Sequence, residues 1–151
     1  MENNQSENLP NPNQIDSGIK TNRLSEVTDL LKDLWYPSES DEPIEWVSFL
    51  GTVSPPLTVS DLEFGLGVSP STVAEEISAE EFWSPVTTME EWYGEDEKAQ
   101  VEKFLEVKAV LETDFKKWQA FRVGQTEVDL YLLTQLNEKE WGGLKTMVVE
   151  T

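Results

Sequence analysis

The sequence predicts an α+β fold in which helices cover a mostly antiparallel sheet. Apolar residues recur at helical spacing over a long segment at about 95–118, which indicates an amphipathic helix. Three strand-like segments follow it with short connections, at 119–123, 126–136 and 144–149. Because short connections join antiparallel neighbours, these strands should form a meander. The earlier segments do not alternate regularly as strand and helix, which argues against a parallel sheet.

The first 20 residues predict a disordered polar tail. They are rich in Asn, Gln, Ser and Pro, with Leu9, Ile15 and Ile19 as scattered apolar residues, so they cannot bury enough surface to offset the entropy of ordering. Residues 21–151 are then expected to form one domain. The chain shows neither a secretory signal nor an apolar run of membrane-spanning length, so we expect a cytoplasmic protein that does not enter membranes.

A helix followed by an acidic turn is predicted at the start of this domain. The helix is capped at Thr21 or Asn22 and is expected to end near Tyr36-Pro37. Its apolar residues recur at helical spacing and are Leu24, Val27, Leu31, Leu34 and Trp35. Two prolines bound the turn, so Glu39 should lie on an exposed tip. The β-branched and aromatic segment Ile44–Leu50 then favours a strand.

Two short helices are predicted in the middle of the chain. Thr58 is a candidate cap for a helix through Phe64, which the following glycines end. Ser78 begins a capping-box pattern that opens the second helix, with Phe82 inside it. A weak strand is expected between the two helices at Thr72–Ile77.

The clearest helix is predicted from about Glu95 to Trp118, after a loop at 87–94. One broad apolar face contains Val101, Phe104, Leu105, Val107, Leu111, Phe115 and Trp118. Acidic residues at its start and Lys116 and Lys117 at its end match the preference of the helix dipole. We expect this helix to be the central packing element.

Charge restricts the possible partners. Thirty acidic residues against 11 basic ones give a formal net charge of -19. Such a chain is repelled by nucleic acid and by anionic membrane surfaces, so direct nucleic-acid binding is not expected. The expected partners are basic proteins or cations.

Residue types also restrict the chemistry. The chain has no Cys and no His, which excludes Ser-His and Cys-His nucleophiles and Cys/His zinc sites. Gly65-Leu66-Gly67 lacks the third glycine of a dinucleotide fingerprint, and no acidic cluster has the spacing of an EF-hand. We therefore expect neither a cofactor nor a metal site of the protein's own.

The acidic residues permit an alternative that is weaker. Paired carboxylates can carry out glycoside hydrolysis, but with 30 acids in 151 residues such pairs arise by chance. A solvated acidic surface is the better interpretation, so we do not expect an enzyme, and a carboxylate-dependent hydrolase stays a distant alternative. Taken singly, Glu39 would be a solvated turn residue and Trp92 a core aromatic, while Thr151 would be an ordinary chain end close behind a strand.

Five short segments, in order along the chain, change this interpretation. They are Ser38-Glu39-Ser40 with Pro43, Thr87-Thr88 with Trp92-Tyr93, the acidic start of the long helix, Arg122-Val123-Gly124 with Glu127-Val128-Asp129-Leu130-Tyr131, and Val148-Val149-Glu150-Thr151. Together they resemble the nuclease A inhibitor family, small acidic proteins that block a sugar-non-specific nuclease. The resemblance runs from about residue 21 to the end and is weak at about 54–77.

The resemblance implies both a fold and a mechanism. The fold is a three-layer α/β/α sandwich similar to the pathogenesis-related-1 fold. In the mechanism an inhibitor glutamate enters the nuclease active site and binds the catalytic Mg²⁺, and Glu39 occupies the matching position. Trp92 and Thr151 match two further contacts, an aromatic anchor and a terminal carboxylate.

The expected partner-binding set also includes the neighbours of Glu39 in the acidic turn: Ser38, Ser40, Asp41 and Glu42. We expect a monomer that binds a basic, Mg²⁺-dependent nuclease one to one and competes with its substrate. The alternative is a DNA mimic or acidic adaptor that binds another basic protein through distributed surface charge.

Overall fold

The computed structural model describes residues 21–38 and 41–150, so the predicted tail at 1–20 lies outside the described residues. Its helices are α3 (Thr21–Leu31), α4 (Val59–Leu66), α5 (Ala79–Thr87) and α6 (Glu95–Asp114). Its strands are β1 (Trp35–Tyr36), β2 (Glu42–Pro43), β3 (Glu45–Leu50), β4 (Ala74–Ile77), β5 (Gln119–Val123), β6 (Glu127–Asn137) and β7 (Glu140–Val149). None of the helices in this described part is long and apolar enough to cross a membrane.

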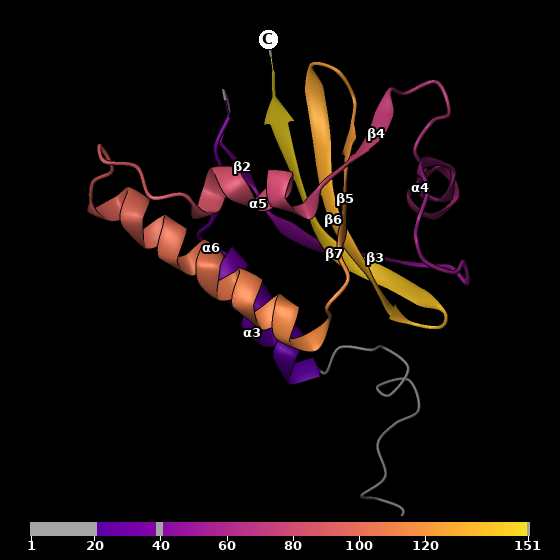
Figure 1. Ribbon diagram of the computed structural model, residues 1–151, viewed down its shortest axis with the longest axis horizontal. Coiled ribbons are helices and arrows are strands. Elements are labelled where there is room, and N and C mark those ends of the chain that lie inside the picture. Colours follow the sequence, from indigo (N-terminus) through magenta and orange to yellow (C-terminus); the bar gives the residue numbers. More distant parts are fainter. Residues whose placement is uncertain (1–20, 39–40, 151) are drawn as a thin grey trace, which may run out of the picture.

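Five strands form one antiparallel sheet in the order β3-β7-β6-β5-β4, which confirms the predicted α+β class (Figure 1). The predicted β5-β6-β7 meander is correct, and β3 and β4 close its two sides. Gly124 makes the β5–β6 turn at a φ of 118°, a conformation that favours glycine.

The last strand begins earlier than predicted. Trp141, Gly142 and Gly143 are part of β7 instead of a turn before it, because the chain already reverses at Glu138 and Lys139. The Asn137 side chain accepts a hydrogen bond from the Lys139 backbone N–H there, at 2.8 Å. The Asn137 side chain therefore holds the turn without the glycines.

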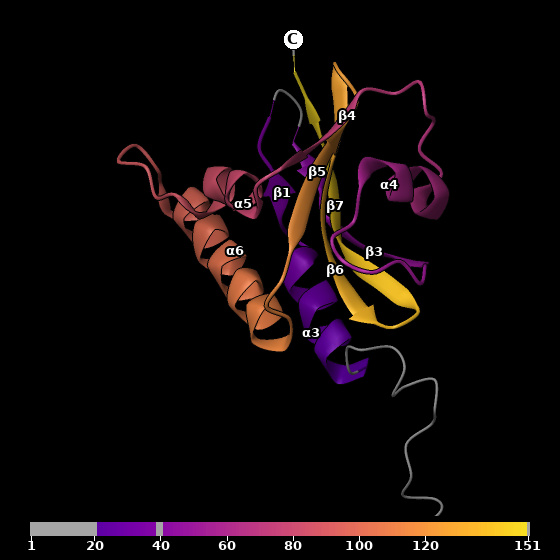
Figure 2. The same cartoon turned by 45° about the vertical axis from the view of Figure 1, so that its right-hand side comes forward.

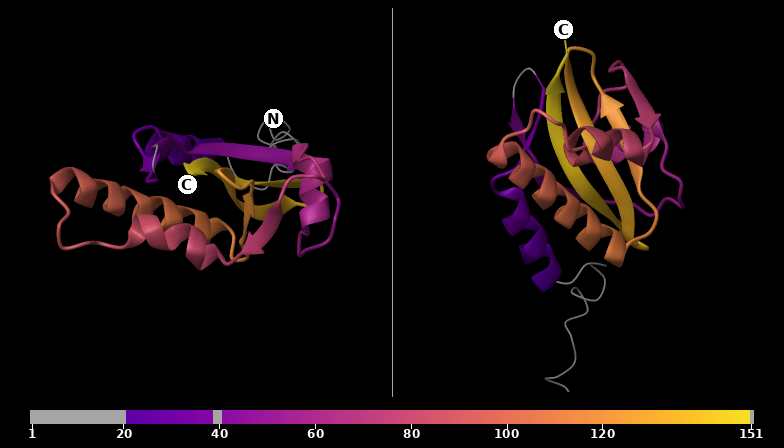
Figure 3. Two further views of the ribbon diagram at one scale, coloured as in Figure 1. Left: turned by 90° about the horizontal axis from the view of Figure 1, so that it is seen from above. Right: turned by 60° about the vertical axis from the view of Figure 1, so that its left-hand side comes forward.

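Helices pack on both faces of the sheet (Figure 2). On one face lie α3, α5 and α6, as the right panel of Figure 3 shows. These helices bury a core with every second residue of the central strands. This core contains Val27, Leu31, Phe82, Trp83, Val86, Phe104, Val107, Leu111, Ala120, Val128, Leu130, Leu132, Leu144 and Val148. On the other face Leu62 of α4 joins a smaller core of Leu57, Phe121, Val123, Tyr131, Leu133 and Trp141.

The two short helices begin where the sequence predicts. Thr58 accepts a hydrogen bond from the Asp61 backbone N–H, and Ser78 accepts one from Glu81, and both form complete capping boxes. The helix that starts after Thr58 ends before Gly67, which has a φ of 72°. These predictions succeed because capping depends on residues three positions apart.

The first helix is shorter than predicted. It ends at Leu31. Trp35 and Tyr36 instead form β1 and pair with Pro43 and Glu42 of β2, in a hairpin whose strands are each two residues long. The Tyr36 ring packs against Phe82, and its hydroxyl donates to the Phe82 carbonyl oxygen at 2.6 Å. The residue before a proline also avoids helical dihedrals, so Pro37 favours the extended conformation of Tyr36. The acidic turn therefore joins two strands of a hairpin and not a helix to a strand.

The long helix also ends early, at Asp114, and its apolar face is narrower than predicted. Leu105 is 45% exposed, whereas Val101, Phe104, Val107 and Leu111 are buried. Lys116 and Lys117 lie beyond the last turn, so the predicted basic end of the helix is wrong. Lys116 still donates to the free carbonyl oxygen of Glu112, at 2.8 Å.

Candidate functional site

The β1–β2 hairpin carries the acidic turn, and three contacts fix its position. Tyr36 binds the Phe82 carbonyl in α5, as described above. On the other arm, the Thr146 hydroxyl of β7 donates to the Pro43 carbonyl oxygen at 3.0 Å. Glu39 and Ser40 at the turn, and Thr151 at the chain end, lie outside the described residues.

The third contact joins the turn to the end of the last strand. The Val149 backbone N–H donates to the Ser38 hydroxyl oxygen at 3.2 Å. Ser38 precedes Glu39, and Val149 is two residues before Thr151. The structure thus brings the described neighbours of two predicted contact residues together, although they are 111 positions apart in the sequence.

Arg122 of β5 holds the residue that precedes Thr151. Its guanidinium forms two hydrogen bonds with the Glu150 carboxylate, at 2.6 and 3.2 Å, and lies 3.6 Å from a Glu75 oxygen. The hydrogen bond from Arg122 lowers the pKa of Glu150, and the same bond raises the pKa of Arg122. The Glu150 backbone N–H also donates to the Thr126 carbonyl oxygen at 2.8 Å. Glu150 is therefore held both by its side chain and by its backbone.

Trp92 lies in the loop between α5 and α6 and is 74% exposed. Its interpretation as a core aromatic is therefore wrong. Its ring stands edge-on to Tyr93, with 4.6 Å between the ring centroids. Since large exposed aromatic side chains often mark interaction surfaces, this position suits a contact residue.

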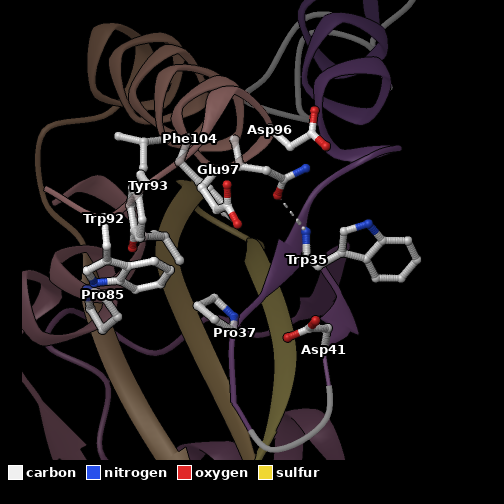
Figure 4. Close-up of a pocket in the computed structure, with 12 residues that line it drawn as sticks. Trp35, Pro37, Asp41, Pro85, Trp92, Tyr93, Asp96, Glu97 and Phe104 are labelled. Carbon is white, nitrogen blue, oxygen red and sulfur yellow. Dashed lines mark hydrogen bonds between the residues drawn. The ribbon is translucent and has the colours of Figure 1, made fainter. Parts of the chain in front are cut away.

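Trp92 and Asp41 line the same pocket, which has a volume of about 340 Å³ (Figure 4). The hairpin contributes Trp35, Pro37 and Asp41, and α5, α6 and their connecting loop contribute the rest: Pro85, Val86, Trp92, Tyr93, Asp96, Glu97, Gln100, Val101 and Phe104. The spacing had predicted that Trp35 joins the apolar face of the first helix, but it lies in β1 and is 47% exposed. Of the predicted contact residues, Asp41 and Trp92 thus border one pocket from different sides.

Pro37 and Pro85 also border a second hollow, which lies toward the end of the last strand. Its lining includes Ser38, Arg122 and Glu150. Pro37 of the hairpin therefore borders one hollow that Trp92 lines and another that Glu150 lines. Among residues 21–38 and 41–150, no three His, Cys, Asp or Glu side chains are grouped so that they could hold a metal ion.

A family model described as nuclease A inhibitor-like protein matches residues 21–151. The chain belongs to this family. The comparison with curated proteins finds no significant match. The match confirms the family that the short sequence segments indicated.

Membership of the nuclease A inhibitor-like family supports a nuclease inhibitor role. The role of Arg122 was missed by sequence reasoning, which used this residue only as one mark of the resemblance. One signal was present: with 30 acidic residues and only 11 basic ones, the composition favours an ion pair at any arginine, including Arg122. Which acid it meets depends on the sheet, because Glu75, Arg122 and Glu150 come from separate segments.

Proposed function

We propose that this protein inhibits a basic, Mg²⁺-dependent DNA/RNA non-specific nuclease by placing the Glu39 carboxylate on the catalytic metal, where the scissile phosphate would bind. The observation that carries the proposal is the Ser38–Val149 hydrogen bond, which joins the flanks of Glu39 and Thr151 on one edge of the molecule. Family membership supports the nuclease partner. Trp92, exposed near the same hairpin, supports a third contact there.

The chemistry of the metal supports a glutamate in this role. A nuclease leaves open positions on its Mg²⁺ for a phosphate oxygen and water, because the metal prefers oxygen ligands and few of them come from the protein. A carboxylate oxygen fits such a position. It carries no phosphodiester bond, so the nuclease has nothing to cleave.

Electrostatics supports the choice of a basic partner. A nuclease that binds nucleic acid without sequence preference needs a basic groove, and a chain with a formal net charge of -19 is attracted to it. Such steering raises association rates about 10- to 10³-fold at low salt. Ser38, Ser40, Asp41 and Glu42 would meet the groove around Glu39.

For the whole molecule we propose a three-layer α/β/α arrangement of the pathogenesis-related-1 type, with a tail at 1–20 outside the inhibitory domain at 21–151. We also propose that it is a monomer that binds its nuclease one to one in the cytoplasm. Helices on both faces of an antiparallel sheet support the first of these.

Inhibition of purified nuclease A in the presence of Mg²⁺ tests the mechanism. Glu39→Gln should weaken inhibition by about 100-fold or more, because the neutral amide loses its charge on the metal. Trp92→Ala should cost about 2 kcal/mol of binding, or about 30-fold. Removal of Thr151 should also weaken inhibition. Glu102→Gln, on an exposed part of α6, is the matched charge control and should leave it unchanged.

Thermal unfolding of each variant shows whether a loss of inhibition reflects binding or folding. Trp92 is exposed, Glu39 belongs to the predicted turn and Thr151 is the last residue, so we expect melting temperatures to stay near that of the parent. The proposed mechanism is wrong if all three variants inhibit the nuclease as well as the parent protein does.

The high net charge favours a second candidate function, binding of a different basic protein through distributed charge. Affinity would then fall steeply with salt and depend on how many acids are removed, wherever they lie. A position-specific loss in Glu39→Gln that persists at high salt would argue against this alternative.

A further inference from the structure

We propose that the pocket between the β1–β2 hairpin and the start of α6 receives an arginine side chain from the basic partner. This inference rests on the proposed function for the identity of the partner. It adds a binding site whose occupant is defined by chemistry, a planar cation on an apolar stem.

The walls of the pocket are apolar and partly aromatic. Trp92 and Tyr93 stand edge-on to each other on one side, and Val86 and Phe104 reach it from α5 and α6. Figure 4 shows Trp92 on one side and Asp41 on the other, with Pro37 between them. A guanidinium can stack on aromatic faces, and the methylene stem of arginine can cover apolar surface.

The charge of the lining is entirely negative. Asp41, Asp96 and Glu97 line the pocket, and no Lys or Arg does. Glu97 is already engaged, because its carboxylate accepts the Gly94 backbone N–H at 2.9 Å. Within the described chain, the carboxylates of Asp41 and Asp96 take part in no hydrogen bond or ion pair. They remain available for charge-assisted hydrogen bonds to a guanidinium.

The exposure of the two tryptophans that line the pocket supports its role as a binding site. Trp92 and Trp35 are 74% and 47% exposed, and both line this pocket. The pocket is not shaped by Trp92 alone, since the hairpin that carries Glu39 supplies its other side. An arginine bound here would therefore fix the distance between the partner's surface and the acidic turn.

A small probe tests the pocket without any nuclease. Nα-acetyl-arginine amide should shift the indole N–H signals of Trp92 and Trp35 in a ¹⁵N-resolved NMR titration, with millimolar affinity. Nα-acetyl-citrulline amide, which has nearly the same shape and no charge, should bind at least about fivefold more weakly. Asp41→Asn/Asp96→Asn should weaken binding of the arginine probe by a similar factor.

The matched control is Glu102→Gln/Glu106→Gln, which removes the same charge from exposed positions of α6 that do not line the pocket. It should change probe binding less than twofold. Equal shifts with arginine and citrulline probes, or equal losses in the two double variants, would overturn the proposal.

Inhibition of nuclease A by the same variants forms the second arm. Asp41→Asn/Asp96→Asn should raise the inhibition constant about tenfold and the control less than twofold. If the parent does not inhibit the nuclease, the proposed function fails while the probe titration still decides the pocket. If the parent inhibits and the two double variants behave alike, the pocket is not used for an arginine and this inference is wrong.

Discussion

Arg122 should control how well the chain end is presented to a partner. Arg122→Gln removes both hydrogen bonds to Glu150, the residue before Thr151. The backbone bond from Glu150 to Thr126 remains, so the strand stays paired and only the orientation of the last residues loosens. We therefore expect a larger effect on inhibition than on folding.

The geometry of the pair sets the size of the effect. The bidentate hydrogen bonding makes this ion pair stronger than an average surface ion pair. The side chains of Arg122 and Glu150 are 28% and 45% exposed, however, so solvent screens their interaction. The pair should contribute about 0.5–1 kcal/mol to the free energy of unfolding. If ordering of the chain end contributes as much to binding, loss of Arg122 weakens inhibition up to about fivefold.

A double-mutant cycle isolates this contribution. Arg122→Gln and Glu150→Gln should each weaken inhibition of nuclease A, and the double variant should lose no more than the larger single loss. Lys139→Gln removes one positive charge at the opposite end of β7 and serves as the matched control. The positioning role is refuted if Arg122→Gln behaves like Lys139→Gln, or if the two single effects simply add.

The pH dependence of the cycle follows from the pKa of Glu150, which Arg122 lowers below its usual value of 4.5. A carboxylate with a lowered folded-state pKa stabilises the fold above its unfolded-state pKa, and this contribution is lost as pH falls through the folded-state value. The coupling between Arg122 and Glu150 in urea unfolding should thus be complete at neutral pH. It should disappear well below pH 4.5, where Glu150 is protonated.

Three further changes test how the site is held in place. Tyr36→Phe removes the hydroxyl that donates to the Phe82 carbonyl oxygen and should lower the free energy of unfolding by about 1 kcal/mol in urea. Ser38→Ala should speed hydrogen exchange of the Val149 amide several-fold, since its side-chain acceptor is lost, and Ser38→Thr should restore the protection. Gly124→Ala should destabilise by about 1–3 kcal/mol in thermal unfolding, because φ is 118° and the new Cβ would collide with a carbonyl oxygen.

Local signals explain what could be predicted from the sequence. Thr58 and Ser78 mark helix starts because a cap and its partner lie three residues apart. The meander could be predicted because Gly124 separates two strands of clear composition. These features depend on few neighbours, so their residues describe them almost completely.

Other features could not be predicted from the sequence because they depend on long-range contacts. Trp35 follows the helical spacing of the residues before it, yet Tyr36 is held by Phe82, 46 positions away, and the helix stops before both. Trp92 is a large apolar residue of a type often found in cores, and its exposure is determined by the loop that carries it. For the same reason the partner of Arg122 among 30 acids could not be chosen from the sequence.

The arrangement of β7 explains why the hairpin and the chain end meet. Strand β3 pairs only with residues 140–145 of β7. The last residues of β7 therefore pair with β6 on one side and extend past the end of β3 on the other. Unpaired backbone groups on such an edge need partners. The hairpin supplies one such partner, since the Ser38 hydroxyl oxygen accepts the Val149 backbone N–H. A side-chain contact adds to it, because the Thr146 hydroxyl donates to the Pro43 carbonyl oxygen. The hairpin that carries the acidic turn is therefore attached to the same edge of β7 that leads to Glu150, and the strand pairing that stabilises the sheet also places Ser38 beside Val149.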